Sequence, residues 1–313
     1  MELTLLLSNK VIQMFLIMLA GYSIVKLGLI KAENSKYISI IVLYIVNPCL
    51  HINSFQISLN EETGKAFAIT MVAAVVLFAL TFLSGNIFQR IFKLSAVEKA
   101  AFLFSNQGNL LVPIVTSVLG SEYLIYMCGF MLVQVPILFS YGRILLGENV
   151  KITPKSVFGN IGFIDMMIGL FFFLTKIQLP VIIKETFSSV QVMAGPLCML
   201  IAGITLGGLS LKEVFGNKRT YLTVILRLII SPLITIFIIK LFNLRNLISN
   251  VQPILYICML CAAAPSASLI VSISQIYGGD YKYASRLNVM TTLFCILSIP
   301  LMALAYEMII GTT

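Results

Sequence analysis

A run of polar residues interrupts an apolar stretch in the segment "FSNQGNLLVPI". Asn106, Gln107 and Asn109 carry amide side chains, which bind a solute by hydrogen bonding but supply no nucleophile or acid. Gly108 loosens the backbone, and Pro113 removes a backbone hydrogen bond. The run therefore predicts a broken helix that binds a small molecule.

A second segment, "AAAPSASL", has a similar character, with Pro265, Ser266 and Ser268 inside an apolar stretch. Unpaired backbone groups persist at membrane depth only where protein or a water-filled cavity supplies partners. Two broken helices that cross near the middle of a bilayer would expose amide ends with partial positive charge. The two segments together predict an anion-binding site built largely from backbone.

Asp165 and Arg227 are the clearest charges inside apolar stretches. A charge at the centre of a bilayer costs at least about 2.5–3.5 kcal/mol on insertion scales, so such residues usually pair or line a cavity. Both lie eight or nine residues into their predicted spans, which places them at similar depth. We predict a structural ion pair between them. The alternatives are contact of Arg227 with a substrate carboxylate, and proton transfer by Asp165.

His51 is the single histidine of the chain and follows Asn47 and Pro48 by one helical turn. One interpretation is an interior polar residue with its hydrogen bonds satisfied. The other is a proton site or substrate ligand, because an unperturbed imidazole titrates near neutral pH. Asn47 is predicted to line the same cavity.

The elements that position these residues follow from composition. Of 313 residues, 59% are hydrophobic and 11% are charged, whereas soluble domains carry about 25% charged residues. The chain is therefore an all-α membrane protein in contact with the lipid bilayer, and the net charge of +9 does not indicate a nucleic-acid partner. At about 20 residues per crossing, ten spans are predicted, at 10–30, 37–57, 66–89, 97–119, 122–145, 157–176, 187–209, 220–241, 252–276 and 284–309.

The distribution of positive charge predicts the orientation. Loops after odd-numbered spans hold fourteen of the 21 Lys and Arg, the other side holds six, and Arg227 lies inside a span. Because cytoplasmic loops carry the excess of Lys and Arg, the odd loops are predicted to be cytoplasmic. We expect a multi-pass protein of the cell (plasma) membrane with both termini extracytoplasmic.

The two halves of the chain resemble each other. Pro113 lies near the centre of the fourth span and Pro265 near the centre of the ninth, and "SVLGSEYLIY" matches "SQIYGGDYKYA". Five spans is an odd number, so the second copy enters the membrane from the opposite face. The prediction is two inverted five-helix repeats, residues 1–150 and 151–313, an architecture common among secondary transporters.

No metal or cofactor is expected. The six cysteines lie in apolar segments, and the pair Cys258 and Cys261 has no second pair and no neighbouring His. Neither H-E-x-x-H nor G-x-S-x-G occurs, and no phosphate-binding G-x-x-x-x-G-K-[ST] is present. "YGGD" is similar to the G-x-G-D of membrane aspartyl proteases, but Tyr277 replaces its first glycine. A catalytic function is therefore not predicted.

Several segments resemble the auxin efflux carrier family of permeases: "SNQGNLLVPI" followed by "LGSEYLIY", "PSASLIVSISQIYGGD" and "SIPLMALAY". The likeness runs over nearly the whole chain. It implies ten spans in two inverted repeats, a scaffold part and a transport part, with a substrate site where spans four and nine cross. A homodimer is plausible by the same analogy.

The resemblance also implies roles for individual residues. Asn106 matches the crossover asparagine of the family, Pro113 and Pro265 match its crossover prolines, and Gln134 lies where relatives often have a glutamine facing the site. Leu111 departs from the pattern, because a second glycine is usual there. The link between the halves is only about ten residues, so the long cytoplasmic loop of the plant exporters is absent.

The leading hypothesis is a secondary carrier for small organic anions, such as mono- or dicarboxylates, with alternating access around a site near the midplane. The alternatives are a sodium-coupled symporter, a channel or sensor on the same fold and, least favoured, an intramembrane enzyme. The candidate binding residues are Asn47, His51, Asn106, Gln107, Gly108, Asn109, Pro113, Gln134, Pro265, Ser266 and Ser268.

Overall fold

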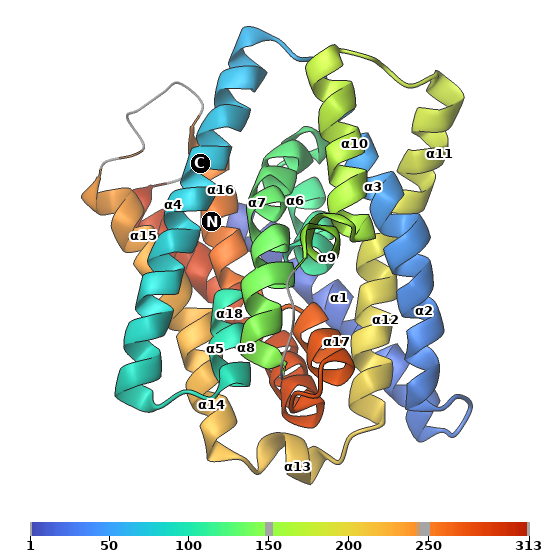
Figure 1. Ribbon diagram of the computed structural model, residues 1–313, viewed down its shortest axis with the longest axis vertical. Helices are drawn as coiled ribbons and strands as arrows, with labels where there is room; N and C mark the ends of the chain where they lie inside the picture. The colour runs from blue at the N-terminus through green and yellow to red at the C-terminus, as the bar shows by residue number, and fades with distance from the viewer. Residues whose placement is uncertain (1, 148–152, 243, 245–250, 312–313) are drawn as a thin grey trace.

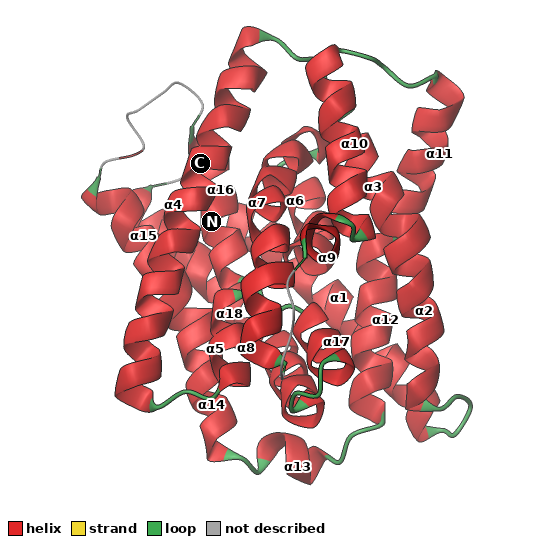
Figure 2. Ribbon diagram, in the orientation of Figure 1, coloured by secondary structure: helices red, strands yellow, loops and turns green. Residues whose placement is uncertain are grey.

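The computed structural model describes residues 2–147, 153–242, 244 and 251–311. Within these residues the protein is all-helical, and Figure 2 shows helices and loops without a strand. Most helices run along the long axis of the molecule in Figure 1, whereas α13 lies across its lower end.

The helical elements fall into two series along the chain. The first series is α1 (Glu2–Lys26), the 3-10 turn η1 (Ala32–Asn34), α2 (Ser35–Ile41), the π-turn η2 (Val42–Val46), α3 (Asn47–Ser54), α4 (Glu61–Phe92), α5 (Ala96–Leu103), the π-turn η3 (Gln107–Leu111), α6 (Val112–Val118), the 3-10 turn η4 (Ser121–Tyr123), α7 (Leu124–Ile137), the π-turn η5 (Leu138–Gly142) and α8 (Arg143–Leu146). The second series is α9 (Pro154–Phe158), α10 (Ile161–Thr175), α11 (Val181–Gln191), α12 (Ala194–Gly207), α13 (Leu211–Phe215), α14 (Lys218–Ile225), the π-turn η6 (Leu226–Ile230), α15 (Ser231–Leu241), α16 (Gln252–Ala263), α17 (Leu269–Ile276) and α18 (Tyr281–Ile310).

Seven helical stretches among the described residues are long and apolar enough to cross a membrane. They are Leu5–Lys26, Ala32–Ser54, Glu61–Phe92, Ser121–Leu146, Val181–Gly207, Lys218–Leu241 and Tyr281–Ile310. Each overlaps one of the ten predicted spans.

The other three predicted spans are not continuous helices of spanning length. The span at 97–119 divides into α5 and the η3–α6 helix, and the span at 252–276 divides into α16 and α17. The span at 157–176 corresponds to α10, an apolar helix of 15 residues. The first two are the segments in which Pro and polar residues, with Gly108 in the first segment, predicted a break.

Proline explains where most of the wide turns lie. The π-turns η2, η3 and η6 each end two residues before a proline, namely Pro48, Pro113 and Pro232. Proline has no N–H to give to the preceding turn, and π-type adjustments satisfy the groups that it leaves unpaired in membrane helices. The fourth π-turn, η5, begins two residues after Pro136. These helices therefore continue across their prolines.

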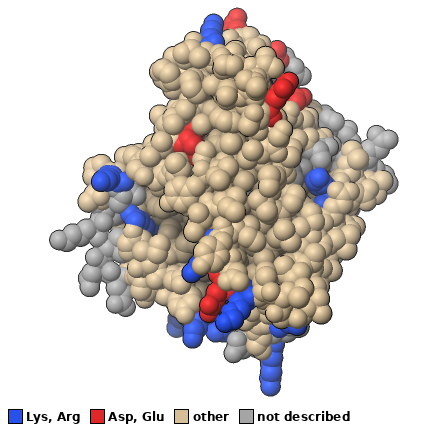
Figure 3. Space-filling model, turned by 90° about the vertical axis from the view of Figure 1, so that its right-hand side faces the viewer, with Lys and Arg blue, Asp and Glu red and all other residues tan. Residues whose placement is uncertain are grey.

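One end of the molecule concentrates positive charge. Figure 3 shows Lys and Arg side chains gathered toward the lower end of one face, in the vertical orientation of Figure 1. A hollow of about 830 Å³ has charges of both signs in its wall: Lys93, Glu98, Arg219, Asp280 and Arg286. Glu98 is buried there and accepts hydrogen bonds from Arg219 Nε and the Tyr283 hydroxyl, both at 2.8 Å. These contacts join α5, α14 and α18 at that end.

Candidate functional site

The two interrupted helices meet at their breaks. Ser105 and Ser266 form an antiparallel bridge. The backbone N–H of Asn106 donates to the Pro265 carbonyl at 2.8 Å, and the N–H of Ala267 donates to the Phe104 carbonyl at 2.9 Å. The sequence therefore predicted both interruptions correctly, and each break supplies partners for the other.

Gln134 on α7 holds the first break in place. Its Oε1 accepts hydrogen bonds from the Ser105 N–H and hydroxyl, both at 3.0 Å, and from Gln107 Nε2 at 3.3 Å. Its Nε2 donates to the Ser105 carbonyl at 2.8 Å. One side chain thus satisfies both backbone groups of Ser105, as the buried break requires.

α18 holds the second break in a similar way. The Ser266 N–H donates to Thr291 Oγ1 at 3.2 Å, and the two hydroxyl oxygens lie 2.9 Å apart. Asn288 Nδ2 donates to the Ser266 carbonyl at 2.8 Å. Ser266 is therefore fully engaged in supporting the crossing.

Arg227, in η6, reaches into the crossing from a third helix. Its guanidinium donates to the carbonyls of Phe102 and Ala264 at 2.9 Å and of Cys261 at 3.2 Å. These carbonyls lie at the C-terminal ends of α5 and α16, where a helix carries partial negative charge and its last carbonyls lack N–H donors from the helix itself. Arg227 is 2% exposed and thus caps both half-helices from inside the protein.

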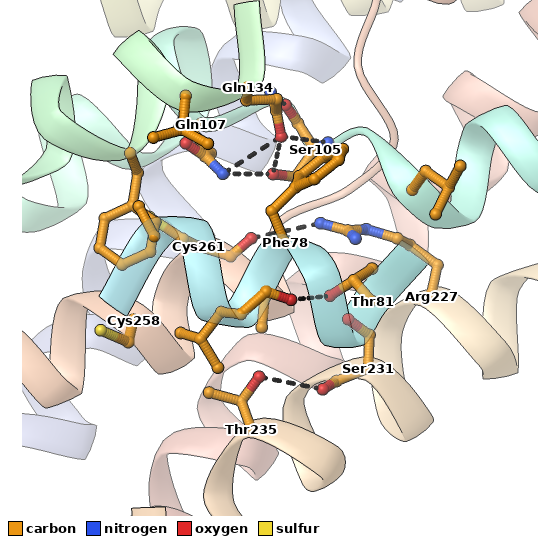
Figure 4. Close-up of a pocket in the computed structure, with 16 residues that line it drawn as sticks. Phe78, Thr81, Ser105, Gln107, Gln134, Arg227, Ser231, Thr235, Cys258 and Cys261 are labelled. Atoms are coloured by element: carbon orange, nitrogen blue, oxygen red, sulfur yellow. Dashed lines mark hydrogen bonds between the residues drawn. The ribbon is translucent and has the colours of Figure 1, made fainter. Parts of the chain in front are cut away.

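A small cavity of about 40 Å³ lies between these groups. Figure 4 shows Gln134, Gln107 and Ser105 on one side of it, with the Arg227 side chain directed inward beside Cys261. A water molecule needs about 10–15 Å³ by the same kind of measure, so the space takes a few waters. Its polar wall is formed by Thr81, Ser105, Gln107, Gln134, Arg227, Ser231 and Thr235.

The predicted residues divide between this cavity and its surroundings. Gln107 and Gln134 line it, and Gln107 Oε1 is buried without a hydrogen-bond partner among the described residues. Asn106 is half-buried and enters the crossing through its backbone N–H. Pro265 contributes its backbone carbonyl, which accepts the hydrogen bond from Asn106. Ser268 is half-buried and directly precedes α17.

The other residues of the first segment support the crossing less directly or fall outside the description. Gly108 lies against Met131, whose methyl carbon would be 2.8 Å from a Cβ at that position. Asn109 and Pro113 belong to η3 and α6, and their side chains lie outside the described part of the structure.

The backbone amides of the two breaks do not form the predicted anion-binding site. The amides of Ser105, Asn106, Ser266 and Ala267 all donate to protein acceptors, so none of these four is available to an anion. The breaks bond to each other because an unpaired buried amide costs roughly 1–3 kcal/mol. At the cavity, the side chain of Arg227 carries the positive charge instead.

The predicted ion pair between Asp165 and Arg227 is wrong. Asp165 Oδ1 lies 2.8 Å from Nδ1 of His51, and both side chains are buried. Arg227 bonds to three backbone carbonyls instead. Asp165 lies in α10, which packs against α3 and α7, whereas η6 packs against α14, α15, α16 and α18. Similar depth in the membrane did not make the two residues neighbours.

His51 and Asn47 lie outside the cavity wall. Both belong to α3, which packs against α10 and α11, and they are separated by one helical turn. Asn47 Oδ1 is buried without a hydrogen-bond partner among the described residues. The prediction that these two residues bind substrate at the crossing therefore has no support from their positions.

Sequence reasoning missed Ser231 and Thr235. Both are buried and line the cavity below Arg227. Residues 227, 231 and 235 follow each other at intervals of four, and this spacing places them on one face of a helix. That polar stripe on an apolar span was the signal that could have identified them.

The arrangement is a buried, positively charged, amide- and hydroxyl-lined cavity at a helix crossing. Comparison with known proteins identifies the family of the chain. The family described as membrane transport protein matches residues 6–162 and 155–303, which together cover almost the whole chain. The chain belongs to this family. The resemblance to the auxin efflux carriers is thereby confirmed.

A curated relative spans the same length. The chain is 25% identical over 312 residues to an uncharacterized transporter of Methanocaldococcus jannaschii, MJ1031, covering 94% of this chain and 96% of the relative. The protein is therefore a multi-pass membrane protein of a transporter family.

Proposed function

We propose that this protein is a secondary permease for small organic anions, such as mono- or dicarboxylates, and that it binds them in the cavity at the helix crossing. The observation that carries the proposal is Arg227, a buried guanidinium in the cavity wall with no carboxylate partner among the described residues. A buried charge is strongly unfavourable unless an opposite charge or hydrogen bonds compensate it. An anionic solute would complete that compensation.

The hydrogen bonds of Arg227 leave room for a ligand. A guanidinium has five N–H donors, and the three carbonyl bonds use one each from Nε, Nη1 and Nη2. One N–H on each terminal nitrogen therefore remains to donate to an anion, and charge-assisted bonds of this kind are the strong ones. The hydroxyls of Ser231 and Thr235 and the amide of Gln107 provide further polar contacts.

Transport requires the site to open to each side in turn. A cavity of about 40 Å³ takes a few waters but not a whole dicarboxylate, which fits a closed conformation. We propose ten spans in two inverted five-helix repeats, residues 1–150 and 151–313, with the interrupted helices as spans four and nine. Movement of one part against the other around a fixed site is the usual mechanism of such folds.

The location of charge supports an orientation. The lower end in Figure 1 carries α13 and the α4–α5 and α17–α18 connections, and Lys and Arg gather at that end in Figure 3. By the rule that cytoplasmic loops are enriched in these residues, we assign this end to the cytoplasm. Both termini then lie on the extracytoplasmic side. We propose that the membrane is the cell membrane. We also expect a homodimer from the family resemblance, which light scattering of the purified protein in detergent tests.

The test is a thermal-shift screen of small carboxylates against the purified protein, with amines and neutral solutes of the same size for comparison. Carboxylates should raise the unfolding temperature, because a ligand that binds only the folded state stabilises it by mass action. Stabilisation by amines or neutral solutes alone would overturn the substrate class.

A matched pair of variants locates the binding. Thr235→Val removes a cavity hydroxyl that, among the described residues, donates to the Ser231 carbonyl. Thr205→Val removes a hydroxyl with the same kind of local bond in α12. Thr235→Val should weaken the carboxylate response, whereas Thr205→Val should not, and equal responses would argue against this cavity.

Sodium coupling is the alternative, since amide and hydroxyl oxygens in the cavity also suit Na⁺. Uptake into proteoliposomes of the carboxylate that stabilises the protein most, measured with sodium or with choline outside, distinguishes transport with sodium coupling from transport without it. Rates that fall in choline would make the protein a sodium symporter.

A further inference from the structure

A second polar site lies between α3 and α10, apart from the cavity at the crossing. His51 Nδ1 and Asp165 Oδ1 are 2.8 Å apart, and each side chain is 2% exposed. A carboxylate only accepts hydrogen bonds, so the proton of this contact lies on Nδ1 of the neutral imidazole. The other ring nitrogen, Nε2, then carries a lone pair.

Three polar atoms at this place have no hydrogen-bond partner among the described residues: His51 Nε2, Asp165 Oδ2 and Asn47 Oδ1. All three are buried. Asn47 precedes His51 by four residues in α3, so the two side chains share one face of the helix. A buried polar group without a partner costs roughly 1–3 kcal/mol, so the structure keeps this pair only partly satisfied.

The surroundings of the pair are tightly packed and apolar. A Cβ at Gly169 in α10 would lie 2.5 Å from the Phe55 ring and 3.2 Å from the His51 carbonyl, so the two helices are in direct contact. The rings of Phe55, Phe67 and Phe173 pack together, with centroids 5.7–6.3 Å apart. Little solvent therefore screens the charge of Asp165.

No other charge compensates it among the described residues. The elements with most contacts to α3 and α10 are η2, α7 and α11, and Phe67 of α4 packs against Phe55 and Phe173. The charged residues near the start of α4, Glu61, Glu62 and Lys65, are exposed. Lys184 of α11 donates to the Gln56 carbonyl, and Glu185 of α11 and Tyr44 of η2 are exposed. Cys128 of α7 faces the pair through Ser54 and is within electrostatic reach of Asp165. Its thiol is fully buried, and a buried thiol carries no charge at neutral pH.

We propose that His51 and Asp165 form a proton-binding site that is separate from the anion cavity. Nε2 of His51 takes a proton from water, and the pair changes from one net negative charge to an ion pair with no net charge. Neutral imidazole beside a buried carboxylate leaves one uncompensated charge in an apolar environment, whereas the ion pair does not. Proton uptake by the pair would then depend on the proton gradient across the membrane. The π-turn η2 directly before α3 provides a second irregularity at the same place, and such turns are frequent at functional sites.

The single histidine makes the test direct. Histidine labelled with ¹³C and ¹⁵N is incorporated into full-length protein that carries a histidine-free affinity tag, in lipid nanodiscs. The spectrum then contains one imidazole, whose ¹⁵N shifts should change in a single step from the neutral to the doubly protonated form as the pH is lowered. Above the step, the ¹⁵N shifts should report a proton on Nδ1 and none on Nε2. This experiment needs no substrate, so its failure and failure of the proposed permease function are distinguishable.

Asp165→Asn removes the charge that holds the imidazolium, so at any given pH less of the doubly protonated form should be present than in wild type. Glu185→Gln is the matched control, because Glu185 is an exposed carboxylate on the neighbouring helix α11. It should leave the titration unchanged. The proposal is overturned if the wild-type resonance does not titrate, if its neutral form carries the proton on Nε2, or if Asp165→Asn titrates as wild type does. The first two outcomes are read from wild-type protein alone, whether or not the variant folds.

Discussion

Arg227 combines two tasks in one side chain. Its three bonds satisfy carbonyls where α5 and α16 end, and its remaining donors and charge belong to the cavity. Helix ends with partial negative charge stabilise a cation, which explains how an arginine is tolerated without a carboxylate at this depth. The same residue therefore links the integrity of the crossing to its affinity for anions.

Substitutions of Arg227 should show how much of carboxylate binding depends on its charge and how much on the planar shape of the guanidinium. Arg227→Gln should abolish most of the thermal stabilisation by carboxylates and weaken their binding about 10- to 100-fold, equivalent to roughly 1.5–3 kcal/mol for hydrogen bonds to a charged group. Arg227→Lys keeps the charge but not the planar fork, so it should retain part of the response. Both variants should unfold at lower temperature than wild type. A folded Arg227→Gln protein with wild-type carboxylate affinity would remove this residue from the site.

Gln134 should matter for stability more than its neutral side chain suggests. Gln134→Ala leaves the N–H and carbonyl of Ser105 without partners at a buried position, at a cost of roughly 1–3 kcal/mol for each group. We expect a fall of several degrees in the unfolding temperature in detergent. Gln13→Ala, at an exposed position of α1, is the control and should have little effect. Equal unfolding temperatures of the two variants would show that the hydrogen bonds of Gln134 to Ser105 do not stabilise the protein.

The residues of the site were only partly predictable. Gln107 and Gln134 stood out because amides are costly in an apolar span, and both line the cavity. The partners of Asp165 and Arg227 were not predictable. The position of a residue along a helix gives its depth in the membrane but not the neighbouring helix that its side chain contacts. His51, four residues from Asn47 in the second span, was the partner that the depth argument overlooked.

At the level of elements, the breaks were the most predictable feature. Asn, Gln, Gly and Pro in the first segment, and Pro with two Ser in the second, weaken a helix by several mechanisms at once, and both predicted segments are interrupted. What sequence did not reveal is that the breaks bond to each other. That pairing depends on the relative position of two helices separated by about 160 residues of chain.

Close packing of α1 and α12 gives a prediction at this scale. A Cβ at Gly203 would lie 1.9 Å from the Met18 carbonyl oxygen, so any larger residue forces the helices apart. Gly203→Ala should lower the unfolding temperature markedly or reduce the yield of folded protein. At Gly162, the nearest atom to an added Cβ is 3.6 Å away. Gly162→Ala should therefore be tolerated, and similar losses in both variants would indicate a general effect of alanine.

For the whole molecule, the two sets of connections have different charge. The α3–α4 and α10–α11 connections lie at the upper end in Figure 1, and α13 and the α4–α5 connection lie at the lower end, where Lys and Arg gather. Charge asymmetry was predictable from loop composition. The hollow at the lower end was not, because Lys93, Arg219 and Arg286 come from three separate parts of the chain.

The orientation can be tested with introduced cysteines. Ser58→Cys places a thiol at an exposed position of the α3–α4 connection, and Lys212→Cys places a thiol at an exposed position of α13. In intact cells, a membrane-impermeant maleimide should label Ser58→Cys but label Lys212→Cys only after permeabilisation. The wild-type protein is the background control, since five of its cysteines are buried and Cys49 is half-buried. The opposite labelling pattern would place the basic end outside the cell, contrary to the rule that positive loops remain in the cytoplasm.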